Sequence, residues 1–470
     1  MLRYVPWLVG MVLFMEQLDS TIVNTAIPSM ARSLGVAPLS LKAIVTSYIL
    51  SLAVGIPVSG WLADRFGTRR VFSTAVAVFT LASILCGVSL NAPMLVAARI
   101  LQGLGAAMMI PVGRLVIVRA FPRSQLLQKM NFVIIPALVG PLLGPTIGGL
   151  IVHWWSWREI FFVNVPVGLA ALWMIRRYMP DYHGTPRPLD VIGLTLFGSG
   201  AALLSWLLEV FGEHTLDATS ATVLLLLSLA LLGAYAFHAG RTTHPLLNLA
   251  LLKIRTFRVS VVGGLLTRLG MGGLPFMLPL LYQLGLGLPA WQSGLLVMPT
   301  ALAAMGMKVV APRFLRRFGY RRVLAINTVM IGINICMFAL IDHDTPLALI
   351  VLLSFTTGFF NSLQFTSMNS LAYADIDDRN SGAANAIASS VQQLSMSFGL
   401  ACGSLLVGWF LGSLPQTDQA AVTHALHAAF LVLGAATVLS SLTFWTLRAE
   451  DGLALTAQAV TPATLPASAE

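Results

Sequence analysis

The amino-acid sequence predicts an all-α membrane protein, and its composition and hydropathy carry that prediction. Of the 470 residues, 57% are hydrophobic and only 10% are charged, compared with about 25% charged residues in soluble proteins. The mean hydropathy is +0.83, and many apolar runs reach the ~20 residues that a helix needs to cross a bilayer. A soluble domain of this size could not cover its surface with so few polar side chains.

The apolar runs are separated by short polar loops, and we expect each run to form one membrane-spanning helix. The segment 449–470 is rich in Ala, Thr and Pro and is predicted to be a disordered tail. Fourteen spans are predicted, at 4–27, 40–62, 71–90, 93–119, 127–152, 159–179, 190–210, 220–239, 257–283, 290–312, 322–341, 346–373, 383–412 and 423–447.

The basic residues predict the orientation of these spans. Most of the 28 Lys and Arg residues fall in loops on one side of the predicted membrane, whereas Arg32, Lys42 and Arg158 fall on the other. Cytoplasmic loops carry the excess of Lys and Arg, so both termini are predicted to be cytoplasmic. The net charge of +10 is explained in the same way, and no nucleic-acid partner is expected.

One internal repeat divides the chain. Arg65–Val71 (RFGTRRV) recurs as Arg317–Val323 (RFGYRRV), each copy lying between two predicted spans. Parallel repeats of this kind are typical of a large class of transporters. Eight spans separate the copies, so two spans are inserted between six-helix halves. The predicted units are a first bundle at 1–182, two linker helices at 183–252, a second bundle at 253–448 and the tail at 449–470.

The first copy of the repeat is a candidate gate. Gly67 permits a tight turn with positive φ, and Asp64 can meet an arginine or a helix N-terminus. The second copy has Arg316 where the first has Asp64, so only the first loop can form that contact. The predicted gating residues of the loop are Asp64, Arg65, Gly67 and Arg69, with topology-setting charge as the alternative reading.

Five segments carry recognisable motifs, namely Leu18–Pro28, the loop Gly60–Arg70, Arg99–Gly105 of span 4, Gly140–Gly149 of span 5 and Trp157–Pro166 before span 6. Together they resemble a known family, the major facilitator superfamily, and in particular its fourteen-span drug:proton antiporter branch of EmrB/QacA-type multidrug exporters. This resemblance implies two six-helix bundles plus two inserted helices, proton-coupled export of drugs, and a multi-pass location in the bacterial plasma (inner) membrane.

Two carboxylates in span 1 are the candidates for proton coupling. Asp19 lies near the middle of the span, where an ionisable group costs about 2.5–3.5 kcal/mol and is a functional hypothesis by default. Glu16 lies three residues earlier on the same helix face, and two carboxylates in a poorly solvated site cannot both ionise cheaply. Arg99 in span 4 is the expected counterion. The alternative is that Asp19 is a structural hydrogen-bond acceptor in a static ion pair.

Span 5 carries small residues at four-residue spacing, which allow helices to approach closely. Close packing is the plain interpretation, and the functional one is that this packing forms an interface that moves during transport. The residues predicted to act in gating are Gly140, Pro141, Gly144, Pro145 and Gly148.

The second half carries two basic residues inside predicted spans, Arg268 and Lys308. They either pair structurally and extend toward the membrane surface, or they bind an anionic group of a substrate. Polar residues inside other spans are weaker candidates, since each is more often a helix–helix contact. The full predicted substrate-binding set is Arg268, Lys308, Asn24, Gln102, Asn361 and Gln364.

The motifs predict a transporter, not an enzyme. The sequence has no GxxxxGK[ST] phosphate loop and no paired Cys or His spacing, so neither ATP, a metal nor another cofactor is expected. The prediction is a proton-coupled exporter of drugs or other small amphipathic compounds, whose partners are its substrate, protons and the lipid bilayer. The alternative is an exporter of an organic anion or carboxylate metabolite. Import, or a receptor on the same scaffold, is less favoured.

Overall fold

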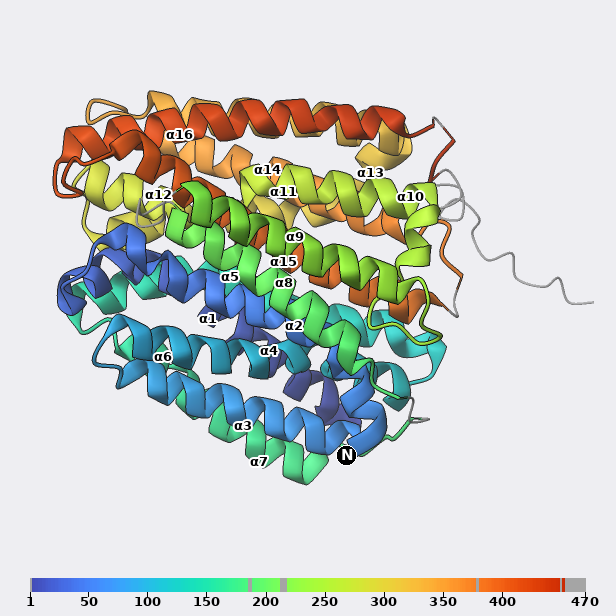
Figure 1. The fold of residues 1–470 in the computed structure, drawn as a ribbon. Coiled ribbons are helices and arrows are strands. Elements are labelled where there is room, and N and C mark those ends of the chain that lie inside the picture. Colours follow the sequence, from blue (N-terminus) through green and yellow to red (C-terminus); the bar gives the residue numbers. More distant parts are fainter. Residues whose placement is uncertain (1, 185–187, 212–217, 378–379, 449, 453–470) are drawn as a thin grey trace, which may run out of the picture.

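The computed structural model describes residues 2–184, 188–211, 218–377, 380–448 and 450–452, and every regular element in these ranges is a helix. The long helices lie side by side in two groups, with the N-terminal helices in one half of the molecule and the C-terminal helices in the other (Figure 1). The predicted all-α fold is therefore confirmed. The predicted tail lies outside the described residues from position 453 onward.

The helices of the first half include one with a side-chain cap at its start. Asn91 caps this helix, because its side chain accepts a hydrogen bond from the backbone N–H of Met94 at 2.9 Å and satisfies an end donor of the helix. The elements are α1 (Val5–Leu34), α2 (Lys42–Phe66), α3 (Thr68–Gly87), α4 (Ala92–Ala120), α5 (Arg123–Trp154), the short α6 (Glu159–Phe162) and α7 (Asn164–Tyr178).

The inserted pair consists of α8 (Val191–Phe211) and α9 (Ala218–Ala239), close to the predicted 190–210 and 220–239. The two helices pack against each other, and α8 also contacts α2 in the first half and α15 in the second. Ala53, Phe197, Tyr235 and Ile387 belong to the apolar cluster at this junction. The pair therefore lies across one seam between the halves.

The second half begins with a segmented span, Arg255–Gly285. It contains α10 (Arg255–Arg258), α11 (Gly264–Met271) and α12 (Leu274–Leu280), interrupted by π-helical turns at Val259–Gly263 and Leu281–Gly285. Such turns are frequent at functional sites. The other helices of this half are α13 (Ala290–Met337), α14 (Leu347–Ala372), α15 (Ser381–Leu411) and α16 (Gln419–Ser440).

The number of spans differs from the prediction. Twelve helical segments in the described part of the chain are long and apolar enough to cross a membrane, so the predicted count of fourteen is not confirmed. Two features account for the difference. α1 is not among the twelve, and the predicted spans 290–312 and 322–341 fall within one continuous segment, Ala290–Leu340.

The two copies of the repeated loop share one backbone feature. Gly67 has a φ of 90° and Gly319 has a φ of 74°, in the left-handed region that glycine adopts without a steric penalty. The positive φ predicted for Gly67 is confirmed. Gly319 interrupts the helical backbone of α13 at the position equivalent to the turn between α2 and α3.

The two ends of the helix bundle differ in how the halves meet. We call the end that holds the N-terminus and the repeated loops the terminal end, and the other the far end. At the far end a single apolar cluster includes Ile27 and Leu41 of the first half and Leu278 and Leu426 of the second. Toward the terminal end each half has an apolar cluster of its own, and a further cluster joins the halves through α8 and α9. The halves therefore pack directly against each other in one cluster at the far end, and meet through the inserted pair toward the terminal end.

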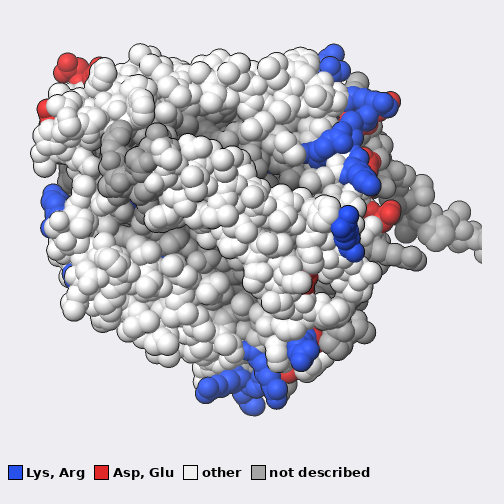
Figure 2. All heavy atoms as spheres, in the orientation of Figure 1, with Lys and Arg blue, Asp and Glu red and all other residues white. Residues whose placement is uncertain are grey.

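The surface charge is also distributed unevenly between the ends and the sides of the helix bundle. In Figure 2 the Lys and Arg side chains gather around the terminal end, on the right, while the long flank between the ends is almost free of charge. An uncharged flank built from apolar helices is the surface expected of a protein in contact with lipid.

Candidate functional site

Asp19 lies at the centre of a buried polar network in the first half. Its carboxylate is fully buried and accepts hydrogen bonds from the Arg99 guanidinium at 2.6 Å, the Gln102 amide at 2.9 Å and the Asn164 amide at 2.6 Å. Ser83 accepts a further bond from Gln102 at 2.8 Å. These residues come from α1, α3, α4 and α7, so four helices of the first half meet at one carboxylate.

Arg99 is held on several sides. Its Nε donates to the carbonyl oxygen of Ile44 at 3.2 Å, and its guanidinium lies 4.1 Å from the centre of the Tyr48 ring. One terminal nitrogen, Nη2, is buried and has no hydrogen-bond partner among the described residues. The pairing predicted for Asp19 and Arg99 is present, and Gln102, predicted to bind substrate, belongs to this network instead of a cavity.

Glu16 joins the same region through Tyr48. The Tyr48 hydroxyl donates to Glu16 at 3.2 Å, and the Gln17 amide donates to the other carboxylate oxygen at 2.6 Å. Glu16 is 2% exposed, whereas Gln17 lines the cavity described below. Tyr48 thus connects Glu16 to Arg99, and Gln17 connects Glu16 to the space between the halves.

Sequence reasoning missed Tyr48, Ser83 and Asn164 as members of this network. Asn164 lies inside the segment Trp157–Pro166 that resembles the family, so the sequence marks this residue. The sequence does not show that its hydrogen-bond partner is Asp19. Tyr48 and Ser83 lie in apolar spans and carry no pattern that distinguishes them from ordinary packing residues.

A cavity of about 440 Å³ lies between the halves. Arg114 of α4 and Lys308 of α13 both line it, together with Gln17, Asn361 and Gln392. No described residue that lines it is acidic. Lys308 and Asn361, both predicted to bind substrate, line this cavity, and Arg114 is an addition from the structure.

We call this space, lined by Arg114 and Lys308, the cationic cavity. Next to it lies an apolar cavity of about 240 Å³. The two share Thr300, Ala304, Asn361 and Phe365 as lining residues. Asn24, another predicted substrate-binding residue, lines the apolar cavity. The space at the middle of the molecule is therefore polar on one side and apolar on the other.

Two further predicted residues lie outside these cavities. Arg268 is 4% exposed, and its guanidinium lies 4.9 Å from the centre of the Phe365 ring. Within the part of the chain that the structure describes, its Nε has no hydrogen-bond partner. Gln364 is fully buried and bonds to Asn327 and Thr328 at 2.8 and 2.7 Å. Gln364 thus forms a helix–helix contact, and Arg268 is separated from the cavities by Phe365.

The first repeated loop contains the predicted polar contact at the terminal end. Asp64 accepts a hydrogen bond from Arg119 of α4 at 2.7 Å. Arg69 donates through its backbone N–H to Asp181 at 3.0 Å and through its guanidinium to the Arg176 carbonyl at 2.5 Å. Arg65 lies over the Trp61 ring at 5.5 Å. These contacts tie together α2, α3, α4 and the chain after α7.

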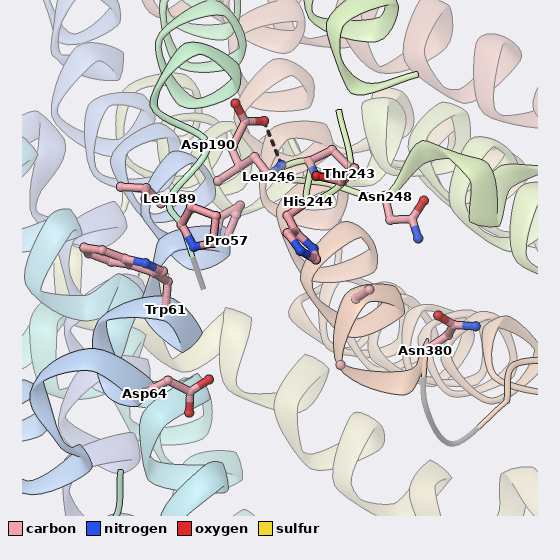
Figure 3. Close-up of a pocket in the computed structure, with 14 residues that line it drawn as sticks. Pro57, Trp61, Asp64, Leu189, Asp190, Thr243, His244, Leu246, Asn248 and Asn380 are labelled. Atoms are coloured by element: carbon pink, nitrogen blue, oxygen red, sulfur yellow. Dashed lines mark hydrogen bonds between the residues drawn. The ribbon is translucent and has the colours of Figure 1, made fainter. Parts of the chain in front are cut away.

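Asp64 also faces a groove of about 480 Å³ at the terminal end (Figure 3). The groove is lined by the end of α2, the segments before α8 and after α9, and the start of α15. The segment before α8 is joined to the segment after α9 by a hydrogen bond, in which the Asp190 carboxylate accepts from the Leu246 N–H at 3.0 Å. A smaller cavity of about 190 Å³ adjoins the cationic cavity, with which it shares Gln17, Ile110, Arg114 and Gln392.

The glycine stripe of α5 packs inside the first half. Any Cβ added at Gly140, Gly144 or Gly148 would strike α1. The contact with the second half is made by neighbouring residues. Pro145 and Gly149 of α5 lie against the start of α13, where a Cβ on Gly149 or Gly294 would strike the backbone of the other half. Pro141 lines the apolar cavity.

No group of three His, Cys, Asp or Glu residues able to hold a metal ion occurs among the described residues. Two helical bundles with a cavity between them, and a buried ion pair beside it, are features of a membrane transporter of small molecules. The chain belongs to the major facilitator superfamily, whose family model matches residues 9–400.

Two bacterial relatives carry the name "Putative multidrug resistance protein MdtD". The protein of Serratia proteamaculans (strain 568) is 41% identical over 90% of this chain and 88% of the relative. That of Enterobacter sp. (strain 638) is 38% identical over 94% of each. The predicted family is confirmed, and the family and these relatives indicate a transporter, not an enzyme.

Solved structures agree in fold. The POT family transporter PepTSo superposes with a TM-score of 0.70 at 14% identity, covering 98% of both chains. A D-xylose-proton symporter gives 0.69 at 16% identity over 95% of this chain and 98% of the other.

Proposed function

We propose that this protein is a proton-coupled exporter of drugs or other small amphipathic compounds across the bacterial inner membrane. The relatives named for multidrug resistance support drugs over the alternative of a carboxylate metabolite. The observation that carries the proton coupling is the buried Asp19 carboxylate, with donors from Arg99, Gln102 and Asn164 around it.

Protonation of Asp19 removes the negative charge that all three donors face. In a buried site the ion pair with Arg99 is then lost, and the guanidinium, which stays charged, needs another acceptor. The site around Asp19 therefore has two arrangements, one with the carboxylate charged and one with it protonated. Transport requires that each arrangement favour a different orientation of the two halves. Proton binding and substrate release are then linked through the packing of α1, α4 and α7.

Glu16 provides the path for the proton in this proposal. Gln17 faces the cavity and bonds to Glu16, and Tyr48 lies between Glu16 and Arg99. A proton that enters from the cavity reaches Glu16 first and Asp19 second. The alternative, a static structural pair, predicts no change in transport energetics when Asp19 is neutral.

We further propose fourteen spans with both termini in the cytoplasm. Dividing Ala290–Leu340 at Gly319, and counting the 30-residue α1, adds two spans to the twelve. An even number keeps the basic loops on one side, as the positive-inside rule requires. The terminal end is then cytoplasmic, and the present arrangement, closed at the far end, faces inward.

The test is proton-driven uptake of two fluorescent amphipathic dyes, the anion 8-anilinonaphthalene-1-sulfonate and the cation ethidium, into inside-out vesicles that carry the protein. For each dye that the wild type transports, Asp19→Asn should abolish uptake driven by a pH gradient, because the variant is permanently neutral, while dye exchange without a gradient persists. Asp344→Asn, in an exposed loop, is the matched control and should behave as wild type. Full gradient-driven uptake by Asp19→Asn across pH 6 to 8 would remove Asp19 from the mechanism.

A further inference from the structure

We propose that the central site is selective for amphipathic organic anions, with the anionic group between Arg114 and Lys308 and the apolar body in the adjoining cavity. This inference rests on the proposed export function and specifies its substrate class.

The first argument is the charge of the cavity. Arg99 and Arg119 on α4 each pair with an aspartate. Arg114, on the same helix, makes no ion pair within the described chain, and the acid that acts on it electrostatically is the buried Glu16, which does not line the cavity. Lys308 makes no ion pair there either, and both side chains line the same cavity. Two cations that face one cavity without an acid attract an anion, and carboxylate groups form short, charge-assisted hydrogen bonds with both types of side chain.

The second argument is that the two cations belong to different halves. Arg114 lies on α4 and Lys308 on the part of α13 before Gly319. An anion held between them neutralises the repulsion and joins the halves through one ligand. Such a ligand binds most tightly to the arrangement in which both side chains reach it, so it shifts the equilibrium between arrangements.

The third argument is the apolar cavity. Pro141, Leu274, Leu278 and Val297 line it, and Asn361 and Phe365 lie at its boundary with the cationic cavity. Apolar surface that enters this space leaves water and gains about 25 cal/mol per Å². A small, highly charged anion gains nothing there, and a lipophilic cation must approach two like charges. The expected order of affinity is amphipathic anion, then neutral analogue, then cation.

Three probes of one shape test this order, namely 4-phenylbutyrate, 4-phenylbutan-1-ol and 4-phenylbutylammonium. Binding is measured on the purified full chain in nanodiscs by isothermal titration calorimetry, without a proton gradient. The anion should bind at least tenfold more tightly than the alcohol, and the ammonium ion weakest. Equal affinities for the three, or preference for the cation, would overturn the proposal.

Variants locate the site. Arg114→Gln and Lys308→Gln should each weaken anion binding about tenfold and leave the alcohol unchanged, whereas Lys308→Arg should retain binding. Arg177→Gln and Lys253→Gln, both at exposed positions, are the controls. Anion affinity that survives the double substitution would show that the anion binds elsewhere and would overturn the assignment.

The binding test of the anion site can succeed or fail independently of the transport test of Asp19. Anion-selective binding with gradient-driven transport intact in Asp19→Asn would retain this site and reject the proton role of Asp19. Gradient-driven transport that depends on Asp19, with no anion preference in binding, would retain the exporter and reject the anion site.

Discussion

The two halves of the molecule place charge in their interiors in opposite ways. In the first half Arg99 meets Asp19 inside a network of neutral donors. In the second half Arg268 is buried against an aromatic ring and Lys308 faces a cavity, neither with an acid among the described residues. The first half also contributes one arginine without an ion pair in the described chain, Arg114, which lines the same cavity as Lys308. We infer that the buried Asp19–Arg99 pair serves the proton, and that Lys308 together with Arg114 serves the substrate.

The largest expected effect comes from removing Arg99. Arg99→Leu leaves Asp19 as a buried, unpaired charge, and breaking such a pair costs about 3–5 kcal/mol. Arg268→Leu removes a buried charge that has no acidic partner, so stability should stay unchanged or rise. Thermal unfolding of the purified variants in detergent measures both.

The double variant Asp19→Asn with Arg99→Leu serves as the control for this pair. It should recover part of the stability that Arg99→Leu loses, because no unpaired carboxylate is left. Equal losses for Arg99→Leu and Arg268→Leu would contradict the difference between the halves.

Packing within the first half gives the next effect. A Cβ at Gly148 would lie 2.6 Å from the backbone oxygen of Ile22, and overpacking of this kind typically costs about 1–3 kcal/mol. Gly148→Ala should lower the unfolding temperature. Gly233→Ala in α9, where a Cβ meets nothing within 4 Å, should not, and similar losses in both would argue against close α1–α5 packing.

Packing between the halves is tested by Gly294→Ala. Its Cβ would strike the backbone of Pro145 in the other half, so the variant should open the far end without the same loss of stability. A cysteine at Thr146, in an otherwise cysteine-free protein, should react faster with a membrane-impermeant maleimide. Gly306→Ala, on the same helix with open space around it, should leave that rate at the wild-type value.

The smallest effect is expected at the repeated loops. Asp64→Asn breaks a partly exposed ion pair worth about 0.2–1 kcal/mol, so the transport rate should fall by no more than about fivefold. Arg316→Gln changes the equivalent position in the second copy and should leave the rate unchanged. A matching fall in both variants would show that the loops act symmetrically.

The sequence predicts much of this arrangement, because buried charges and repeated turns leave local marks. Asp19, Arg99 and the glycine turns stand out in apolar surroundings, and their pairing and backbone conformation follow from simple rules. Tyr48 does not stand out, and Arg114 stands out only as a basic residue inside a span, because their roles depend on which residues of other helices face them. Arg268 lies behind Phe365 for the same reason: the direction in which a helix face points is set by packing in three dimensions.

The inserted pair of helices, α8 and α9, covers only one of the two sides on which the halves meet. The halves meet along two seams, α2 with α15 and α5 with α13, and α8 covers only the first. In the bilayer, the boundary between α2 and α15 is covered by α8, whereas the boundary between α5 and α13 is not covered by the inserted pair. Lipophilic compounds in the membrane are therefore expected to reach the boundary between the halves more easily on the α5–α13 side than on the side that α8 covers.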